Sequence, residues 1–194
     1  MNLKKKISER IIILSALFML IACKDVIDYE YSNYHCNLTI DNSVHLDATL
    51  ASSMNTLSPG VFTTIKPLYR DGVYYFHFRN NQGLESKKQF NAIDERLQSN
   101  LRVGMSNGLI VGFGNLDTPA HFYAYDLQCP NCFDALPQRN YELTVTGTGI
   151  ATCKTCHRSY NLNTGGNIVS GERGKTMTRY RASTTGPNGV LHVY

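Results

Sequence analysis

The sequence predicts a mainly β fold, because short stretches rich in β-branched and aromatic residues alternate with turn signals along most of the chain. Residues 73–78 follow Asp71-Gly72, and residues 109–113 follow Asn107-Gly108. Two Cys-x-x-Cys motifs lie among these stretches, and no internal repeat or low-complexity tract interrupts them. We therefore expect an all-β domain of small antiparallel sheets, arranged as a sandwich or barrel, with a tip formed by the two cysteine loops.

The remaining elements are predicted from the same signals. Gly186-Pro187-Asn188-Gly189 predicts a hairpin between the last two strands, and Gly147-Thr148-Gly149 predicts another turn. Apolar residues at helical spacing predict two helices, at residues 48–57 and 85–101. Further strands are expected at residues 122–127, 141–146, 178–183 and 190–194.

The N-terminus has the order of a secretory signal. Four basic residues among the first ten precede an apolar run of eleven residues, 11–21. A membrane-spanning helix needs roughly 20 apolar residues, so a permanent transmembrane anchor is the poorer interpretation. Residues 1–22 are therefore predicted to be cleaved.

The end of this signal, Leu20-Ile21-Ala22-Cys23, resembles the lipobox of bacterial lipoproteins, in which the cysteine is lipidated and becomes the new N-terminus. The resemblance implies a membrane anchor on Cys23. Lys24 follows in place of an inner-membrane Asp, which favours an outer-membrane lipoprotein of the cell envelope, on its periplasmic or surface face. The alternative is an ordinary signal peptide with a coincidental cysteine.

The rest of the chain is predicted to form a polar tether, residues 23–34, and one domain, residues 35–194. Residues 1–22 hold four of the 19 basic and one of the 15 acidic residues, which leaves a mature net charge of +1. Such a balance gives no support to nucleic-acid binding.

The two Cys-x-x-Cys motifs are the most specific signal in the chain. They are Cys129-Pro130-Asn131-Cys132 and Cys153-Lys154-Thr155-Cys156, with twenty residues between Cys132 and Cys153. Each motif lets two sulfur atoms converge on one ion, and two motifs complete a tetrahedral all-sulfur site. We therefore predict one metal centre on Cys129, Cys132, Cys153 and Cys156, in loops at about residues 127–166.

Two other uses of these cysteines remain open. An exported protein meets an oxidising compartment, which favours structural disulfides and a disulfide-stapled binding module. A thioredoxin-like redox pair needs a Cys-x-x-Cys at the start of a helix after a strand in a βαβ unit, and we expect this β-rich context not to provide one.

The segment from Cys153 to Gly165 resembles the second cluster-binding loop of Rieske iron–sulfur domains, which reads Cys-x-x-His-Gly, an aromatic residue, then Thr-Gly. Cys153, Tyr160 and Thr164-Gly165 match that pattern, and Cys129-Pro130 matches the start of the first loop, Cys-Pro-His. Both histidine ligands are absent: Cys132 stands near the place of one and Cys156 in the place of the other. The resemblance covers roughly residues 105–194 and extends to Rieske-like lipoproteins of the Bacteroides group.

The resemblance implies a [2Fe–2S] electron carrier, but the two imidazoles that raise the Rieske potential are missing. Four thiolates suit zinc, mononuclear iron or a [2Fe–2S] cluster. A cluster assembled in the cytoplasm usually needs a twin-arginine signal, whereas Arg10 stands alone after three lysines. We therefore favour a structural zinc ion, with an iron-based electron carrier as the alternative.

The other candidate residues are weaker. His157 occupies the Gly position of the Rieske loop and is a candidate hydrogen-bond donor next to the metal ligand Cys156. Cys36 is left over and is expected to be buried on a strand with Leu38 and Ile40. No nucleophile motif or phosphate loop is present, so the sequence predicts no catalysis. Apart from the membrane, the sequence indicates no partner, neither another protein nor a redox partner.

Overall fold

The computed structural model describes residues 30–106 and 108–194. The predicted signal peptide at residues 1–22, the predicted lipidation site Cys23 and the predicted tether up to residue 29 lie outside the described residues, so these predictions stay predictions. Within the described part, no helix is both long and apolar enough to cross a membrane.

The predicted β architecture is confirmed: three antiparallel sheets carry the fold, and the described strands form no closed barrel. The first sheet has the order β13 (Ala182–Thr184), β14 (Val190–Val193), β1 (Cys36–Asp41) and β5 (Arg102–Val103). The second has the order β12 (Arg179–Tyr180), β7 (Phe122–Asp126), β6 (Leu109–Phe113), β2 (Phe62–Arg70), β3 (Val73–Asn80) and β4 (Glu85–Gln89). The third has the order β11 (Asn167–Ser170), β10 (Ser159–Asn161), β9 (Ile150–Cys153) and β8 (Leu143–Val145).

Two hydrophobic cores share strands β6 and β7 as a common wall. Leu109 and Val111 of β6 face the core between the first two sheets, which we call the sandwich core, while Ile110 faces the core beneath the third sheet. On β7, Ala124 faces the sandwich core and Tyr125 faces the other one. Burial on both faces explains why residues 109–113 are apolar without alternation.

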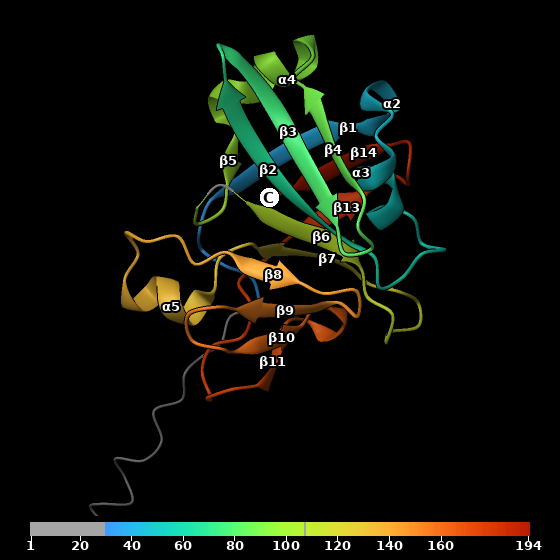
Figure 1. The fold of residues 1–194 in the computed structure, drawn as a ribbon. Coiled ribbons are helices and arrows are strands. Elements are labelled where there is room, and N and C mark those ends of the chain that lie inside the picture. Colours follow the sequence, from blue (N-terminus) through green and yellow to red (C-terminus); the bar gives the residue numbers. More distant parts are fainter. Residues whose placement is uncertain (1–29, 107) are drawn as a thin grey trace, which may run out of the picture.

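The third sheet, together with helix α5 (Pro130–Ala135), forms a separate lobe at one end of the molecule (Figure 1). We call residues 128–170 the cysteine lobe, because they carry both Cys-x-x-Cys motifs. The predicted turn at residues 147–149 joins β8 to β9, and the predicted C-terminal hairpin joins β13 to β14. Both turn predictions are therefore confirmed.

The prediction of one helix over residues 85–101 is wrong for its first part. Residues 85–89 form β4 and pair with β3, and only then do α4 (Ala92–Leu97) and the 3₁₀ turn η1 (Gln98–Asn100) follow. Phe90 ends the strand by packing against Phe76 in the sandwich core, with ring centroids 4.2 Å apart. Asn91 then starts the helix with a capping box shared with Asp94.

The other predicted helix is shorter than expected, and several strands were not predicted, of which β2 is the longest. Helix α3 (Ala48–Ser53) is capped by Asp47 and ends before Met54, while the short α2 (Asn42–His45) precedes it. Strand β2 escaped the sequence analysis because Lys66, Pro67 and Arg70 interrupt its pattern. Pro67 is tolerated because β2 pairs with β6 only over residues 62–65, so that at Pro67 the strand has β3 alone as a neighbour.

Asp126 is a buried polar hub at the end of β7. Its carboxylate accepts hydrogen bonds from the Met105 amide at 2.7 Å, the Gln128 amide at 2.8 Å and the Tyr180 hydroxyl at 2.8 Å. Burial raises the pKa of Asp126, although these three donors oppose that shift. The hub therefore ties β7, β12 and the loop after β5 together at the entry to the cysteine lobe.

We predict that Tyr180→Phe lowers the free energy of unfolding by about 2 kcal/mol near neutral pH, because the buried carboxylate loses a donor. This hydrogen bond favours the ionised carboxyl, so its contribution is lost as pH falls through the raised pKa of Asp126. The difference between the two proteins in urea denaturation should therefore shrink between about pH 7 and about pH 4.

Tyr194→Phe is the matched control, because Tyr194 is 54% exposed and should change stability by less than about 0.5 kcal/mol. Equal unfolding curves for Tyr180→Phe and the unmodified protein would contradict the assignment of Asp126 as a stabilising hub.

Candidate metal centre

The first cysteine motif lies where β7 leads into α5. Cys129 is the N-cap residue of α5, Pro130 occupies its first turn, and Cys132 lies one turn further on. The Phe133 amide donates to the Cys129 carbonyl at 3.0 Å, which fixes the turn. Both sulfur atoms of this motif therefore point into the cysteine lobe from a rigid helical start.

The second motif lies in the turn between β9 and β10. Cys153 is the last residue of β9, and its amide and carbonyl hydrogen-bond to Arg158 at 2.9 Å and to His157 at 3.0 Å. His157 has a φ of 57°, in the left-handed region that favours glycine. The position at which the Rieske loop has Gly is thus one where the backbone needs a positive φ.

The four sulfur atoms converge at one point. Cys129 Sγ lies 3.6 Å from Cys156 Sγ, and Cys132 Sγ lies 3.8 Å from Cys153 Sγ. All four lie within 4.8 Å of one another, and no disulfide joins them. Zinc–sulfur bonds of about 2.3 Å in a tetrahedron require sulfur atoms about 3.8 Å apart, so the group could hold one metal ion.

A hydrogen-bond network surrounds Cys129. The Tyr160 hydroxyl lies 3.2 Å from Cys129 Sγ and accepts a hydrogen bond from Asn131 Nδ2 at 2.9 Å. The Asn131 side chain also bonds both backbone groups of Lys175, at 2.8 and 2.9 Å. Because the Tyr160 oxygen accepts the hydrogen bond from Asn131, the Tyr160 hydroxyl proton is free to be donated to the Cys129 sulfur. Residues next to metal ligands commonly make such hydrogen bonds.

The environment divides the cysteines into a buried set and one that faces solvent. Cys129 and Cys153 are 0% and 1% exposed, whereas Cys156 is partly exposed. Burial raises the pKa of Cys129 and of Cys132. Burial also acts on Cys156, but hydrogen bonds from the Arg158 backbone and guanidinium outweigh it and lower its pKa to about 7.

The structure brings together every cysteine that the sequence predicted for the metal centre, and it adds residues that the motifs did not indicate. Tyr160 was named only as an aromatic match, and Asn131 and Arg158 were not assigned any role at the site. Arg158 is held by Glu172, with Nη2 to Oε2 at 3.1 Å. Their positions in the sequence could have indicated a role at the site: Asn131 lies between Cys129 and Cys132, and Arg158 follows Cys156 by two residues.

The other predictions near the site have mixed outcomes. Cys36 is buried on β1, as predicted. The role of His157 as a hydrogen-bond donor stays a prediction, since its side chain is exposed. The first motif does start helix α5 after strand β7, but both neighbours of β7, strands β6 and β12, are antiparallel to it, so the βαβ unit of a thioredoxin-like pair is absent here, as expected.

The chain enters the fold beside this site. Glu30 forms an ion pair with Arg179 at 3.3 Å, and the Ser32 amide donates to the Arg179 carbonyl at 2.8 Å. The Tyr34 ring contacts Phe133 of α5 edge-on, with centroids 6.0 Å apart. Residues 30–34, which were assigned to the tether, therefore contact the fold next to the cysteine lobe.

No known protein family, curated protein or solved structure matches this chain. The resemblance to Rieske domains therefore gains no support from relatives, and the case for a metal centre depends on the geometry of the four sulfur atoms.

We predict that Tyr160→Phe weakens metal binding by about 10- to 100-fold, because Cys129 Sγ loses its hydrogen-bond partner. Competition with a chromophoric chelator measures the affinity. Tyr125→Phe is the control: Tyr125 is buried in the same core, but its hydroxyl donates to the Leu162 carbonyl at 2.8 Å and not to a sulfur. Equal losses in the two variants would show a general loosening of the lobe instead.

Proposed function

We propose that this chain is a lipid-anchored protein of a bacterial cell envelope, and that its β domain is closed by one structural zinc ion on Cys129, Cys132, Cys153 and Cys156. The observation that carries the proposal is the convergence of four cysteine sulfur atoms within 4.8 Å of one another. The protein would act by binding and not by catalysis.

The sulfur geometry favours one ion over a two-iron cluster. In a [2Fe–2S] cluster each iron takes two cysteines, and the bridging sulfides hold the two cysteine pairs apart. Here sulfur atoms of different motifs lie 3.6 and 3.8 Å apart, and all four lie within 4.8 Å of one another. Sulfur atoms that all lie near one another match the corners of one tetrahedron.

Zinc suits a chain exported in an unfolded state, since the ion can bind after export and has no redox chemistry. Mononuclear iron would fit the same four sulfur atoms, so the two metals are separated by experiment below. The near-complete burial of Cys129 and Cys153 limits access of oxidants to these thiolates. Once the domain has folded around the ion, this burial works against disulfide formation in an oxidising compartment.

The cysteine lobe is the part of the fold that gains most from an ion. Its strands contain three or four residues each, and α5 contains six. Elements this short form few hydrogen bonds and contribute little apolar surface, so small lobes of this kind are commonly held by a metal. A tetrahedral ion would join α5 to the β9–β10 turn across the lobe.

The predicted anchor would place this lobe close to the membrane. Glu30 is the seventh residue after Cys23, and an extended chain spans at most about 3.5 Å per residue, so Glu30 would lie within about 25 Å of the lipid. Glu30 and Tyr34 contact the fold beside the cysteine lobe. In the anchored protein, the metal site would therefore face the membrane side.

We predict that the purified domain contains one zinc ion per chain and that Cys132→Ser abolishes stoichiometric binding, whereas Cys36→Ser retains it. Cys36 is buried on β1, outside the four-cysteine group. Elemental analysis of anaerobically purified protein and an absorption spectrum measure the outcome. Bound iron with visible charge-transfer bands would contradict the zinc proposal and support an electron-transfer centre instead. Absence of any metal with two intact disulfides would overturn the metal centre itself.

We predict that Cys23→Ser moves the full chain from the membrane to the soluble fraction of a bacterial host, because a lipid on Cys23 supplies the anchor. Cell fractionation and incorporation of labelled fatty acid measure the result. Cys36→Ser is the matched control and should remain membrane-bound. A Cys23→Ser protein that is still membrane-bound and unlabelled would rule out the lipobox as the source of attachment.

A further inference from the structure

A polar cleft lies between the outer face of the six-stranded sheet and the cysteine lobe. Its volume is about 490 Å³, within the range of small-molecule sites. Thr64 and Lys66 of β2 and His77 and Arg79 of β3 form one wall. Strand β8 and the preceding residues 140–142 form the opposite wall.

The second cysteine motif closes one side of this cleft. Lys154 and Thr155, the two residues between Cys153 and Cys156, both line it. Their backbone is fixed by the turn that also presents the sulfur atoms. The metal loop therefore has two faces, with cysteines turned toward the ion site and Lys154 and Thr155 turned toward the cleft.

The basic side chains of the sheet wall lie on one face because of the register between β2 and β3. Lys66 pairs with His77 across β2 and β3, and Thr64 pairs with Arg79 two residues along. Residues two apart point to the same side of a sheet, so all four side chains face the cleft. Their partners on the opposite side, such as Ile65 and Phe78, are buried in the sandwich core.

Two of the four basic side chains around the cleft have a carboxylate partner, and two form no ion pair within the described part of the chain. Lys66 forms an ion pair with Glu142, and His77 Nε2 lies 2.7 Å from Glu85 Oε1. Arg79 and Lys154 are exposed and form no ion pair with any residue of 30–106 or 108–194. The cleft thus presents one guanidinium and one ammonium group, from two of its sides, that form no ion pair among the described residues, although Glu85 lies opposite Arg79 in the neighbouring strand β4.

We propose that this cleft binds a small ligand carrying two or more oxyanion groups, with carboxylate or phosphate oxygens held by Arg79 and Lys154. Guanidinium and ammonium groups are the usual partners of such oxygens in proteins, and charge-assisted hydrogen bonds are among the strong ones. The hydroxyls of Thr144 and Thr155 lie in the same lining and can donate to the ligand. The proposal goes beyond the metal centre and does not depend on which ion fills it.

Isothermal titration calorimetry at low salt tests the proposal, with inorganic pyrophosphate, digalacturonate and neutral maltose as probes. We expect at least one anion to bind and maltose not to bind. Arg79→Gln and Lys154→Gln should each weaken the anion about tenfold, since each removes one charged hydrogen-bond donor. Preference for pyrophosphate or for digalacturonate distinguishes a phosphate ligand from an acidic sugar.

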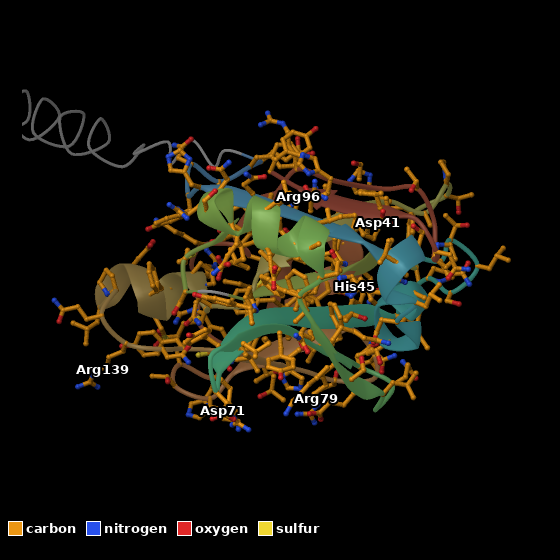
Figure 2. All side chains as sticks on the ribbon, turned by 90° about the horizontal axis from the view of Figure 1, so that it is seen from above. Asp41, His45, Asp71, Arg79, Arg96 and Arg139 are labelled. Carbon is orange, nitrogen blue, oxygen red and sulfur yellow. The ribbon has the colours of Figure 1, made fainter. Side chains whose placement is uncertain are left out.

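The matched control is Arg96→Gln. Arg96 is an exposed arginine on α4, and Figure 2 shows it on the side of the molecule opposite to Arg79. Glu142→Gln is the complementary variant: it removes the acidic group of the lining and frees Lys66, so it should bind the anion several-fold more tightly. A gain of affinity cannot arise from a folding defect.

Metal content is measured on every variant, so that failure of the cleft and failure of the metal centre give different results. Weaker anion binding at unchanged metal content supports the cleft. Unchanged anion affinity in Arg79→Gln and Lys154→Gln, or no binding of either anion to the unmodified protein, overturns it.

Discussion

Burial of β6 and β7 on both faces is the constraint on which the rest of the structure depends. One face of this strand pair closes the sandwich core, and the other supports the cysteine lobe. Any residue on either strand must therefore fit between two packed layers. Gly112 shows how tight the fit is, since a Cβ there would lie 2.3 Å from the Val61 carbonyl oxygen. The double burial sets the orientation of the lobe, and with it the position of both cysteine loops.

The two cysteine motifs reach the same point from different kinds of local structure. The first begins a helix and the second lies in a β-turn, yet their sulfur atoms meet across the two motifs, Cys129 with Cys156 at 3.6 Å and Cys132 with Cys153 at 3.8 Å. Each half of the site is thus incomplete without the other, and the ligand set exists only when β7 and the β9–β10 hairpin are both in place. An ion bound there would join segments that are more than twenty residues apart in the chain.

The sequence indicated the four cysteines and most strands because their signals are local. Residues 109–113 and 190–193 form strands with nearly the predicted bounds, since apolar runs and turn residues suffice to identify them. The segment after residue 84 was misread as a helix because its alternating exposed Glu, Lys and Gln residues belong to an edge strand. Such a strand forms only by pairing with β3, which is not visible in the local sequence. Asn131 and Arg158 could not be assigned, because their roles come from contacts with residues 160, 172 and 175, which only the folded chain brings near.

The metal loop and the cleft share a backbone but recognise different chemistry. Thiolates suit a soft or borderline cation, while exposed ammonium and guanidinium groups suit oxyanions. The thiolates and the cationic groups stay separate because the β9–β10 turn directs neighbouring side chains to opposite sides: Cys153 is buried, whereas Lys154 is exposed. Four thiolates around a divalent cation would carry a net charge of about −2, and the nearby lysine and arginine side chains offset it. Arg158, whose guanidinium hydrogen-bonds Cys156, therefore stabilises a thiolate, while Arg79 and Lys154 remain available to an anionic ligand in the cleft.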